Sequence, residues 1–341
     1  MRNVFAYILG AFFLSLAFGC QQGEDSYDDT PETNLNALWE IIDQHYCFVT
    51  YKETELGFKW SDIRQKYLAQ LNPHMSKAQL FEVLCNMLAE LRDGHVNLFA
   101  SIDMGRNWSW KYDYPLNFDQ EVRDAYLGKD YHIAGGLEYR ILEDNVAYVV
   151  YESFSNATGD GNLDDMLYTL RLCDGMILDI RSNPGGDLTN AEHLCRRFTN
   201  QKTLVGYTSH KTGKGHDDFS TPMAEYIEPS KGIRWQKPCV VLTNRSCFSA
   251  ANTFVRNMSQ FPLVTIMGDQ TGGGSGMPFS SEIPIGWSVR FSACPSYDAE
   301  MQHIEFGIAP DIYCPLDTEA AKEGIDTMIE GARTFIKERF R

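Results

Sequence analysis

The chain has 341 residues and a formal net charge of -16, and 43% of its residues are hydrophobic. This length and apolar fraction allow one large globular domain or two modest ones with a sizeable core. The acidic balance argues against a nucleic-acid-binding protein, because contacts to phosphates require a basic face.

The N-terminus has the features of an export signal. Arg2 precedes an almost wholly apolar run, 4–18, which is too short and wrongly flanked for a membrane span. The run closes at Gly19-Cys20 in a pattern that resembles a bacterial lipoprotein processing site. We therefore predict a signal peptide over 1–19 and lipidation of Cys20, with an ordinary secretory signal as the alternative. The polar, acidic stretch 20–33 is predicted to be a tether in the bacterial cell envelope, periplasmic or surface-exposed.

Apolar spacing predicts three helices within an N-terminal helical subdomain, 34–95. They cover 34–48, 60–71 and the segment from the N-cap Ser76 to about Leu91. From residue 96 to the C-terminus the pattern changes to the mixed texture of a catalytic core. Extended runs are predicted at 96–99, 131–134, 137–142, 146–151, 175–180, 239–243, 264–268 and 287–291. Helices are predicted at 160–172, 188–198, 249–258 and, as one closing helix, 318–340.

Strands that alternate with helices indicate an α/β fold with a largely parallel sheet. Eight cysteines remain after Cys20, and most lie in apolar patterns without CxxC spacing. We interpret them mainly as buried thiols. No zinc-type ligand pattern is present, and we expect neither a metal nor an organic cofactor.

Five motifs carry the chemistry of this sequence. They are Leu91-Arg92-Asp93-Gly94-His95, the segment 177–186 ending in Asn183-Pro184-Gly185-Gly186, the segment 244–254 around Ser249, the glycine-rich run 268–274, and 305–311 beginning Glu305-Phe306-Gly307. In their order and approximate spacing, over about 34–312, they resemble the tail-specific (C-terminal processing) serine peptidase family. The resemblance implies a parallel α/β core of crotonase-like and Clp-like type, preceded by a small helical bundle.

Ser249 is the candidate nucleophile. The resemblance places the nucleophile before a small residue at a helix start, as in Ser249-Ala250-Ala251. A helix N-terminus offers free N–H groups and a partial positive charge, so the N–H of Ala250 is a candidate oxyanion donor. The family implies a second donor from the glycine loop, either Gly185 or Gly186. The alternatives are that Ser249 only caps the helix and that Ser246 is the reactive serine.

The base is predicted to be a histidine. Many family members use a lysine after the serine, but the corresponding position is Gly274, and no lysine occurs between Lys237 and Lys322. The tricorn-like branch implies a histidine at the position of His95, and neutral imidazole suits proton abstraction near neutral pH. Glu305 is the candidate orienting carboxylate. His303 is the rival base, and Asp93 is interpreted as a helix cap.

The segment 101–130 is too short for the PDZ domain that lysine-type members carry between the helices and the core. The resemblance thus predicts a lipid-anchored serine peptidase without a PDZ domain, acting on peptides or unfolded proteins through an acyl-enzyme on Ser249. The first alternative is an inactive relative that binds a peptide or an apolar ligand in the same cleft. The second is another acyl hydrolase, such as an esterase.

Overall fold

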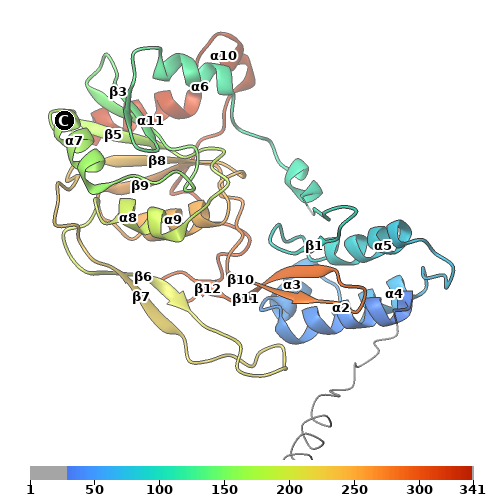
Figure 1. Cartoon of the computed structure of the whole chain (residues 1–341). Coiled ribbons are helices and arrows are strands. Elements are labelled where there is room, and N and C mark those ends of the chain that lie inside the picture. Colours follow the sequence, from blue (N-terminus) through green and yellow to red (C-terminus); the bar gives the residue numbers. More distant parts are fainter. Residues whose placement is uncertain (1–28, 107, 340–341) are drawn as a thin grey trace, which may run out of the picture.

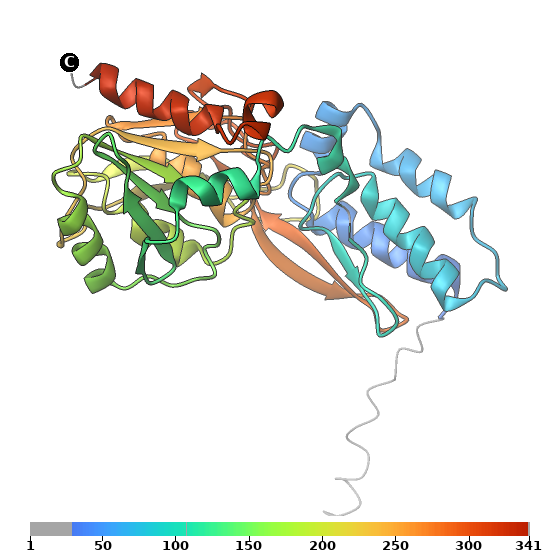
Figure 2. The ribbon, with the colours of Figure 1, turned by 90° about the horizontal axis from the view of Figure 1, so that it is seen from above.

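The chain folds into two lobes that lie side by side, as the computed structural model of residues 29–106 and 108–339 describes (Figures 1 and 2). The predicted signal peptide and Cys20 lie outside the described residues. Helix α2 (Pro31–His45) begins inside the segment predicted to be a tether. Thr30 caps this helix by accepting the Thr33 N–H, and proline suits its first position. Within the described residues, no helix is both long and apolar enough to cross a bilayer.

The larger lobe is built on a seven-stranded sheet, in the order β13-β9-β8-β5-β4-β3-β2. Neighbours from β13 to β4 are parallel, and β3 and β2 extend the sheet antiparallel. Strands β4, β5 and β8 are buried along their whole length, as expected where helices cover both faces. The predicted α/β fold is therefore confirmed. The strands are β2 (His132–Ala134), β3 (Leu137–Ile141), β4 (Val146–Val150), β5 (Gly175–Asp179), β8 (Cys239–Thr243), β9 (Val264–Gly268) and β13 (Ile312–Tyr313).

Helices cover the two faces of this sheet (Figure 1). One face packs against α7 (Asp160–Leu170), α8 (Leu188–Cys195) and α9 (Ala250–Met258). The other packs against α6 (Gln120–Leu127) and α11 (Thr327–Arg339). The prediction of a single closing helix over 318–340 is wrong, because α10 (Thr318–Lys322) ends before α11 begins. Gly324 has a φ of +78°, a left-handed conformation that glycine adopts readily at a helix end.

The smaller lobe combines the N-terminal helices with strands from the rear of the chain (Figure 2). Its helices are α2, α3 (Val49–Leu56), α4 (Trp60–Leu68) and α5 (Lys77–Ala89), followed by a short 3-10 helix, η1 (Ser109–Asp113). The four α-helices share one apolar core with β11 (Ser288–Cys294), and β11 pairs with β1 (Asn97–Phe99) and β10 (Met277–Glu282). A third sheet joins β12 (Ser296–Tyr297), β6 (Thr203–Thr208) and β7 (Met223–Ile227). This interleaving brings the front and rear of the chain together.

Candidate active site

Ser249 stands at the start of α9 with an unusual backbone. Its φ is +58° and its ψ is -119°, and its side chain does not cap the helix. Few residues other than glycine adopt such a φ, and strained positions of this kind cluster at functional sites. Its N–H donates to the Gly273 carbonyl at 2.9 Å, which ties the serine to the glycine-rich run. This geometry is inconsistent with the alternative that the Ser249 side chain serves only as a helix cap.

His95 and Ser249 lie in direct contact although 154 positions separate them in sequence. The Nε2 atom of His95 is 3.0 Å from the Ser249 Oγ. His95 is only 8% exposed, and burial lowers its pKa below the ordinary value, which the nearby Asp93 carboxylate and Ser275 carbonyl partly oppose. The imidazole is therefore neutral near pH 7 and can accept a proton from the serine hydroxyl.

The glycine loop packs directly against Ser249. A Cβ on Gly185 would lie 2.8 Å from the Ala250 nitrogen and 2.5 Å from the Phe248 carbonyl oxygen, so a side chain there would cover the Ala250 N–H. The N–H of Gly185 donates to the Asn183 side chain at 2.9 Å. The N–H groups of Gly186 and Ala250 donate no hydrogen bond to another described residue. These two donors are thus free beside the serine, and the φ of +96° at Gly185 requires glycine.

Glu305 does not contact His95 directly. Its Oε2 accepts the Ser275 N–H at 2.8 Å, and its Oε1 pairs with the Lys52 Nζ at 2.8 Å. Glu305 and the imidazole therefore make no direct contact among the described residues. Ser275 lies between them and its carbonyl is near the His95 ring, but the His95 Nδ1 has no hydrogen-bond partner in the described part of the chain. Burial, then the nearby Asp93, raise the pKa of Glu305 to about 7.

Asp93 joins the same buried group. Its Oδ1 accepts the His95 N–H at 2.7 Å, and its Oδ2 accepts the Tyr46 hydroxyl at 2.7 Å. Asp93 thus shapes the loop that carries His95, rather than capping a helix. Both Asp93 and Lys52 are almost completely buried. Sequence analysis missed Lys52 and Ser275: Lys52 lies in a polar run that resembles an exposed helix face, and Ser275 directly follows the glycine-rich run.

The rival candidates lie elsewhere. The His303 ring stacks on Tyr51 at 4.2 Å between centroids, and it makes no contact with Ser249 among the described residues. Ser246 donates its N–H to Asn244 in the turn before the serine. No three histidine, cysteine or carboxylate residues in the described part of the chain are grouped to hold a metal ion.

A cleft of about 600 Å³ opens in front of Ser249 and His95. Gly186 and Ser275 line it beside the serine, and strands β6, β7, β10 and β11 supply most of the farther wall. Strands from two different sheets thus line the cleft in front of the Ser249 hydroxyl. The site can therefore bring a carbonyl group to a nucleophile, a base and two free N–H donors.

Sequence comparisons point to one family. A model of peptidase family S41 matches residues 145–314, and a model of the tricorn protease C1 domain matches residues 27–89. The carboxy-terminal processing protease CtpA of Bacillus subtilis (strain 168) is 25% identical over 187 residues, which cover 54% of this chain and 38% of that protein. A carboxyl-terminal-processing protease of Picosynechococcus sp. is 25% identical over 146 residues, 42% of this chain and 32% of that protein. The chain thus matches well under half the length of these curated relatives.

Solved structures agree with this assignment. A crystal structure of a protein described as a peptidase, from Parabacteroides merdae, is 47% identical with a TM-score of 0.87, covering 91% of this chain and 97% of that chain. Mature CPAF complexed with lactacystin has a TM-score of 0.69 at 11% identity, covering 92% of this chain and 97% of that one, and shows the fold alone. The chain belongs to peptidase family S41, the tail-specific proteases, and is a serine-type peptidase.

Proposed function

We propose that this peptidase cleaves peptide bonds through an acyl-enzyme on Ser249, with His95 as general base. His95 Nε2 takes the hydroxyl proton while the Ser249 Oγ attacks the substrate carbonyl carbon, and the imidazolium then protonates the leaving amine. Water, activated by the same imidazole, releases the acyl group. The single observation that carries this proposal is the 3.0 Å contact between His95 Nε2 and Ser249 Oγ.

The oxyanion of the tetrahedral intermediate is stabilised, in this proposal, by the N–H groups of Gly186 and Ala250. The support is that neither group has a partner among the described residues, whereas the Gly185 N–H is engaged by Asn183. Gly185 contributes by leaving open the space in front of the Ala250 nitrogen. A single donor of this kind contributes roughly 3 kcal/mol to the transition state.

Glu305 is assigned here as a positioning residue that acts through Ser275. A carboxylate that accepts the Ser275 N–H fixes the backbone of Ser275, whose own carbonyl lies near the imidazole. Its negative charge also favours the imidazolium that forms during attack. Lys52 favours the ionised form of that carboxylate through the 2.8 Å ion pair, which partly opposes the effect of burial on its pKa.

Active-site labelling tests this mechanism. A fluorophosphonate reacts only with an activated serine, so we expect it to modify the wild-type chain at Ser249 and to leave Ser249→Ala unlabelled. Ser246→Ala is the matched control, because this serine lies in the same turn without a histidine contact. Labelling should also fall by about 10⁴-fold in His95→Ala. Wild-type protein that stays unlabelled would favour the inactive relative that binds a ligand in the cleft.

Peptide and ester substrates separate a peptidase mechanism from another acyl hydrolase. The proposed substrates are peptides or unfolded proteins, and turnover of a denatured protein should disappear in Ser249→Ala together with labelling. Ester hydrolysis without any peptide hydrolysis would contradict the proposed substrate class. This measurement also bears on whether the cleft admits an extended chain.

We also propose that the mature protein is anchored through a lipidated Cys20 to a membrane of the bacterial cell envelope. The support is the sequence alone: Arg2, the apolar run 4–18 and Gly19-Cys20. Metabolic labelling with an alkyne fatty acid should tag the wild-type chain and not Cys20→Ser. Equal labelling of both would contradict the anchor.

A further inference from the structure

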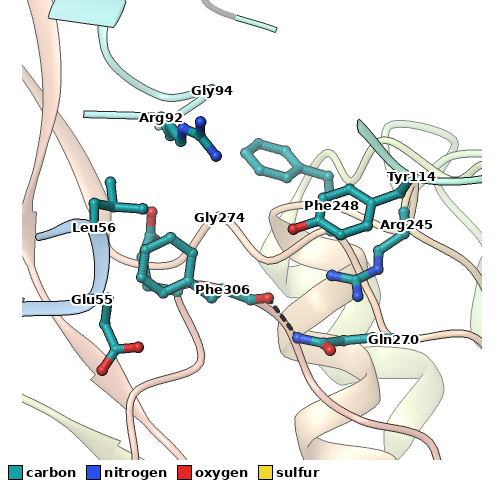
Figure 3. A pocket seen from close by; sticks show the side chains of 12 residues that line it. Glu55, Leu56, Arg92, Gly94, Tyr114, Arg245, Phe248, Gln270, Gly274 and Phe306 are labelled. Atoms are coloured by element: carbon teal, nitrogen blue, oxygen red, sulfur yellow. Dashed lines mark hydrogen bonds between the residues drawn. The ribbon is translucent and has the colours of Figure 1, made fainter. Parts of the chain in front are cut away.

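A second cavity, of about 240 Å³, lies behind the catalytic loops (Figure 3). Its wall includes the residues that immediately precede His95, Ser249 and Ser275 in the chain, whereas those three residues themselves line the catalytic cleft. The two cavities therefore share the same three loops as a wall. A cavity of about 150 Å³ already holds a molecule the size of benzene, so this one has room for a small organic ligand.

Two arginines reach this cavity from different parts of the fold. Arg92 belongs to the loop after α5, and Arg245 belongs to the loop after β8; Figure 3 shows them on different sides of the cavity. The nearest carboxylates are Asp113, 3.9 Å from Arg92, and Asp269, 3.7 Å from Arg245, both beyond hydrogen-bond distance. Neither guanidinium donates a hydrogen bond to another described residue.

Arg245 is the more constrained of the two. Its guanidinium lies 4.0 Å above the Tyr114 ring, and its Nε is buried without a hydrogen-bond partner among the described residues. Buried donors of this kind are normally paired, and a guanidinium fits a carboxylate with two parallel hydrogen bonds. Arg92 and Arg245 thus each offer guanidinium donors to an anionic group in the cavity.

The rest of the lining combines apolar side chains with two carboxylates, those of Glu55 and the buried Glu305. Leu56 and the ring of Phe306 form the side opposite Arg245 in Figure 3, and the exposed Glu55 lies next to Leu56 on α3. Gln270 donates its amide N–H to the Phe306 carbonyl at 2.8 Å, which leaves the Gln270 side-chain oxygen as an acceptor. The cavity therefore offers positive, apolar and negative regions in turn.

We propose that this cavity binds a free amino acid with an apolar side chain. Its carboxylate would lie between Arg92 and Arg245, its side chain against Leu56 and Phe306, and its ammonium toward Glu55. Glu305, the proposed positioning residue, also lines this cavity, but binding of a ligand here does not depend on Ser249 being the nucleophile. A ligand in this cavity would contact the loops that carry His95, Ser249 and Ser275. Its binding can therefore affect the positions of these loops.

Calorimetric titration tests the site, with the full chain carrying Ser249→Ala so that no turnover occurs. The probes are leucine, leucinamide, N-acetylleucine and inorganic phosphate. We expect leucine to bind, and the other three to bind at least about tenfold more weakly, because each lacks the carboxylate, the ammonium or the apolar group. The proposal is overturned if leucine does not bind at millimolar concentration or if any other probe binds as tightly.

Variants assign the binding to this cavity. Arg245→Met and Arg92→Met should each weaken leucine binding at least about tenfold. Arg171→Met is the matched control, since Arg171 also stacks on a tyrosine, Tyr168 at 3.8 Å, but lies outside the cavity. Arg92 is 54% exposed, so its replacement tests the site even if Arg245→Met fails to fold. Unchanged binding in folded Arg92→Met would reject the proposal.

Discussion

Two buried ionic clusters in this molecule have the same composition and different surroundings. The sheet cluster consists of Arg181, Asp179, Asp326 and Tyr148 beside strand β5. The loop cluster consists of Lys52, Glu305, Asp93 and Tyr46 beneath the His95 loop. Each has one cation, two carboxylates and one tyrosine, and all eight side chains are almost fully buried.

The difference lies in how the cation is placed. Arg181 binds both carboxylates, at 2.6 Å to Asp179 and 2.8 Å to Asp326, and it lowers the pKa of Asp179 despite burial. Among the described residues, Lys52 forms an ion pair with one carboxylate, that of Glu305, and its ammonium also donates to the Arg92 carbonyl at 3.3 Å; burial raises the pKa of Glu305 to about 7. The sheet cluster is therefore closed and permanently charged, whereas the loop cluster can change its protonation near neutral pH, next to His95.

Removal of the cation from the sheet cluster should have the largest effect on stability. Arg181→Met leaves two buried carboxylates without their partner, so we expect the free energy of unfolding to fall by about 3–5 kcal/mol. Urea denaturation followed by circular dichroism measures this loss. The exposed Arg171→Met should change it by less than about 0.5 kcal/mol. A loss below about 1 kcal/mol in Arg181→Met would contradict a role of this cluster in stabilising the folded state.

Neutralising Glu305 should change activity and its pH dependence. We expect Glu305→Gln to lower kcat/KM about 100-fold at neutral pH, because the charge beneath His95 is lost. In the proposed mechanism, wild-type activity requires an ionised Glu305, with its pKa raised to about 7, and a neutral His95, with its pKa below the ordinary 6.5. The acid limb of log kcat/KM should therefore approach a slope of two, and the variant a slope of one. Equal slopes in both proteins would reject the role of Glu305.

Stability should respond to pH in opposite directions in the two clusters. The pKa of Glu305 is raised from 4.5 to about 7, so between these values the folded state keeps a proton that the unfolded chain has released, and this group lowers stability as pH rises. The pKa of Asp179 is lowered from 3.8, so its stabilisation is present above that value and is lost as pH falls. Urea unfolding at several pH values, compared with Glu305→Gln, isolates the first contribution.

The parts of the fold that the sequence predicts best are those with one dominant signal. Strands β5 and β8 are continuous apolar runs, and α5 has the capping box that Ser76 and Gln79 form. Sequence analysis missed β7 and β10 because most of their residues are exposed, so neither shows a buried alternation. The pattern over 318–340 predicts one helix where the structure has α10 and α11, although Gly324 between them is a typical residue for a helix end.

The site shows a similar division. His95 and Ser249 are placed by motifs, and the structure brings these two side chains together. Lys52 has no such signal, because its burial depends on Glu305 meeting it from a loop more than 200 residues later. The intermediate position of Ser275 likewise depends on how the glycine-rich run turns in space. Contacts that arise only from tertiary packing leave no periodic pattern in the sequence.

The same substitution made in the loop cluster should have a smaller effect on stability. Lys52→Met removes the cation from Glu305, but a carboxyl whose pKa is already near 7 can take up a proton, so we expect a loss of about 1–2 kcal/mol. Activity should fall about tenfold at pH 7 and recover by about pH 9, because loss of the Lys52 ammonium raises the pKa of Glu305 further. A loss of activity that is equal at both pH values would indicate a structural role only.

The two tyrosines provide the finest comparison. Each donates its hydroxyl to a buried carboxylate, Tyr148 to Asp179 at 2.8 Å and Tyr46 to Asp93 at 2.7 Å. Loss of either hydrogen bond, in Tyr148→Phe or Tyr46→Phe, should lower the free energy of unfolding by about 1.5 kcal/mol. Only Tyr46→Phe should also lower kcat/KM, by about threefold. The reason is that the Asp93 carboxylate accepts the His95 N–H at 2.7 Å, whereas Asp179 has no contact with His95 or Ser249 among the described residues. If the two variants lose activity equally, the loop cluster acts on the catalytic residues only through general stability, and the distinction between the clusters fails.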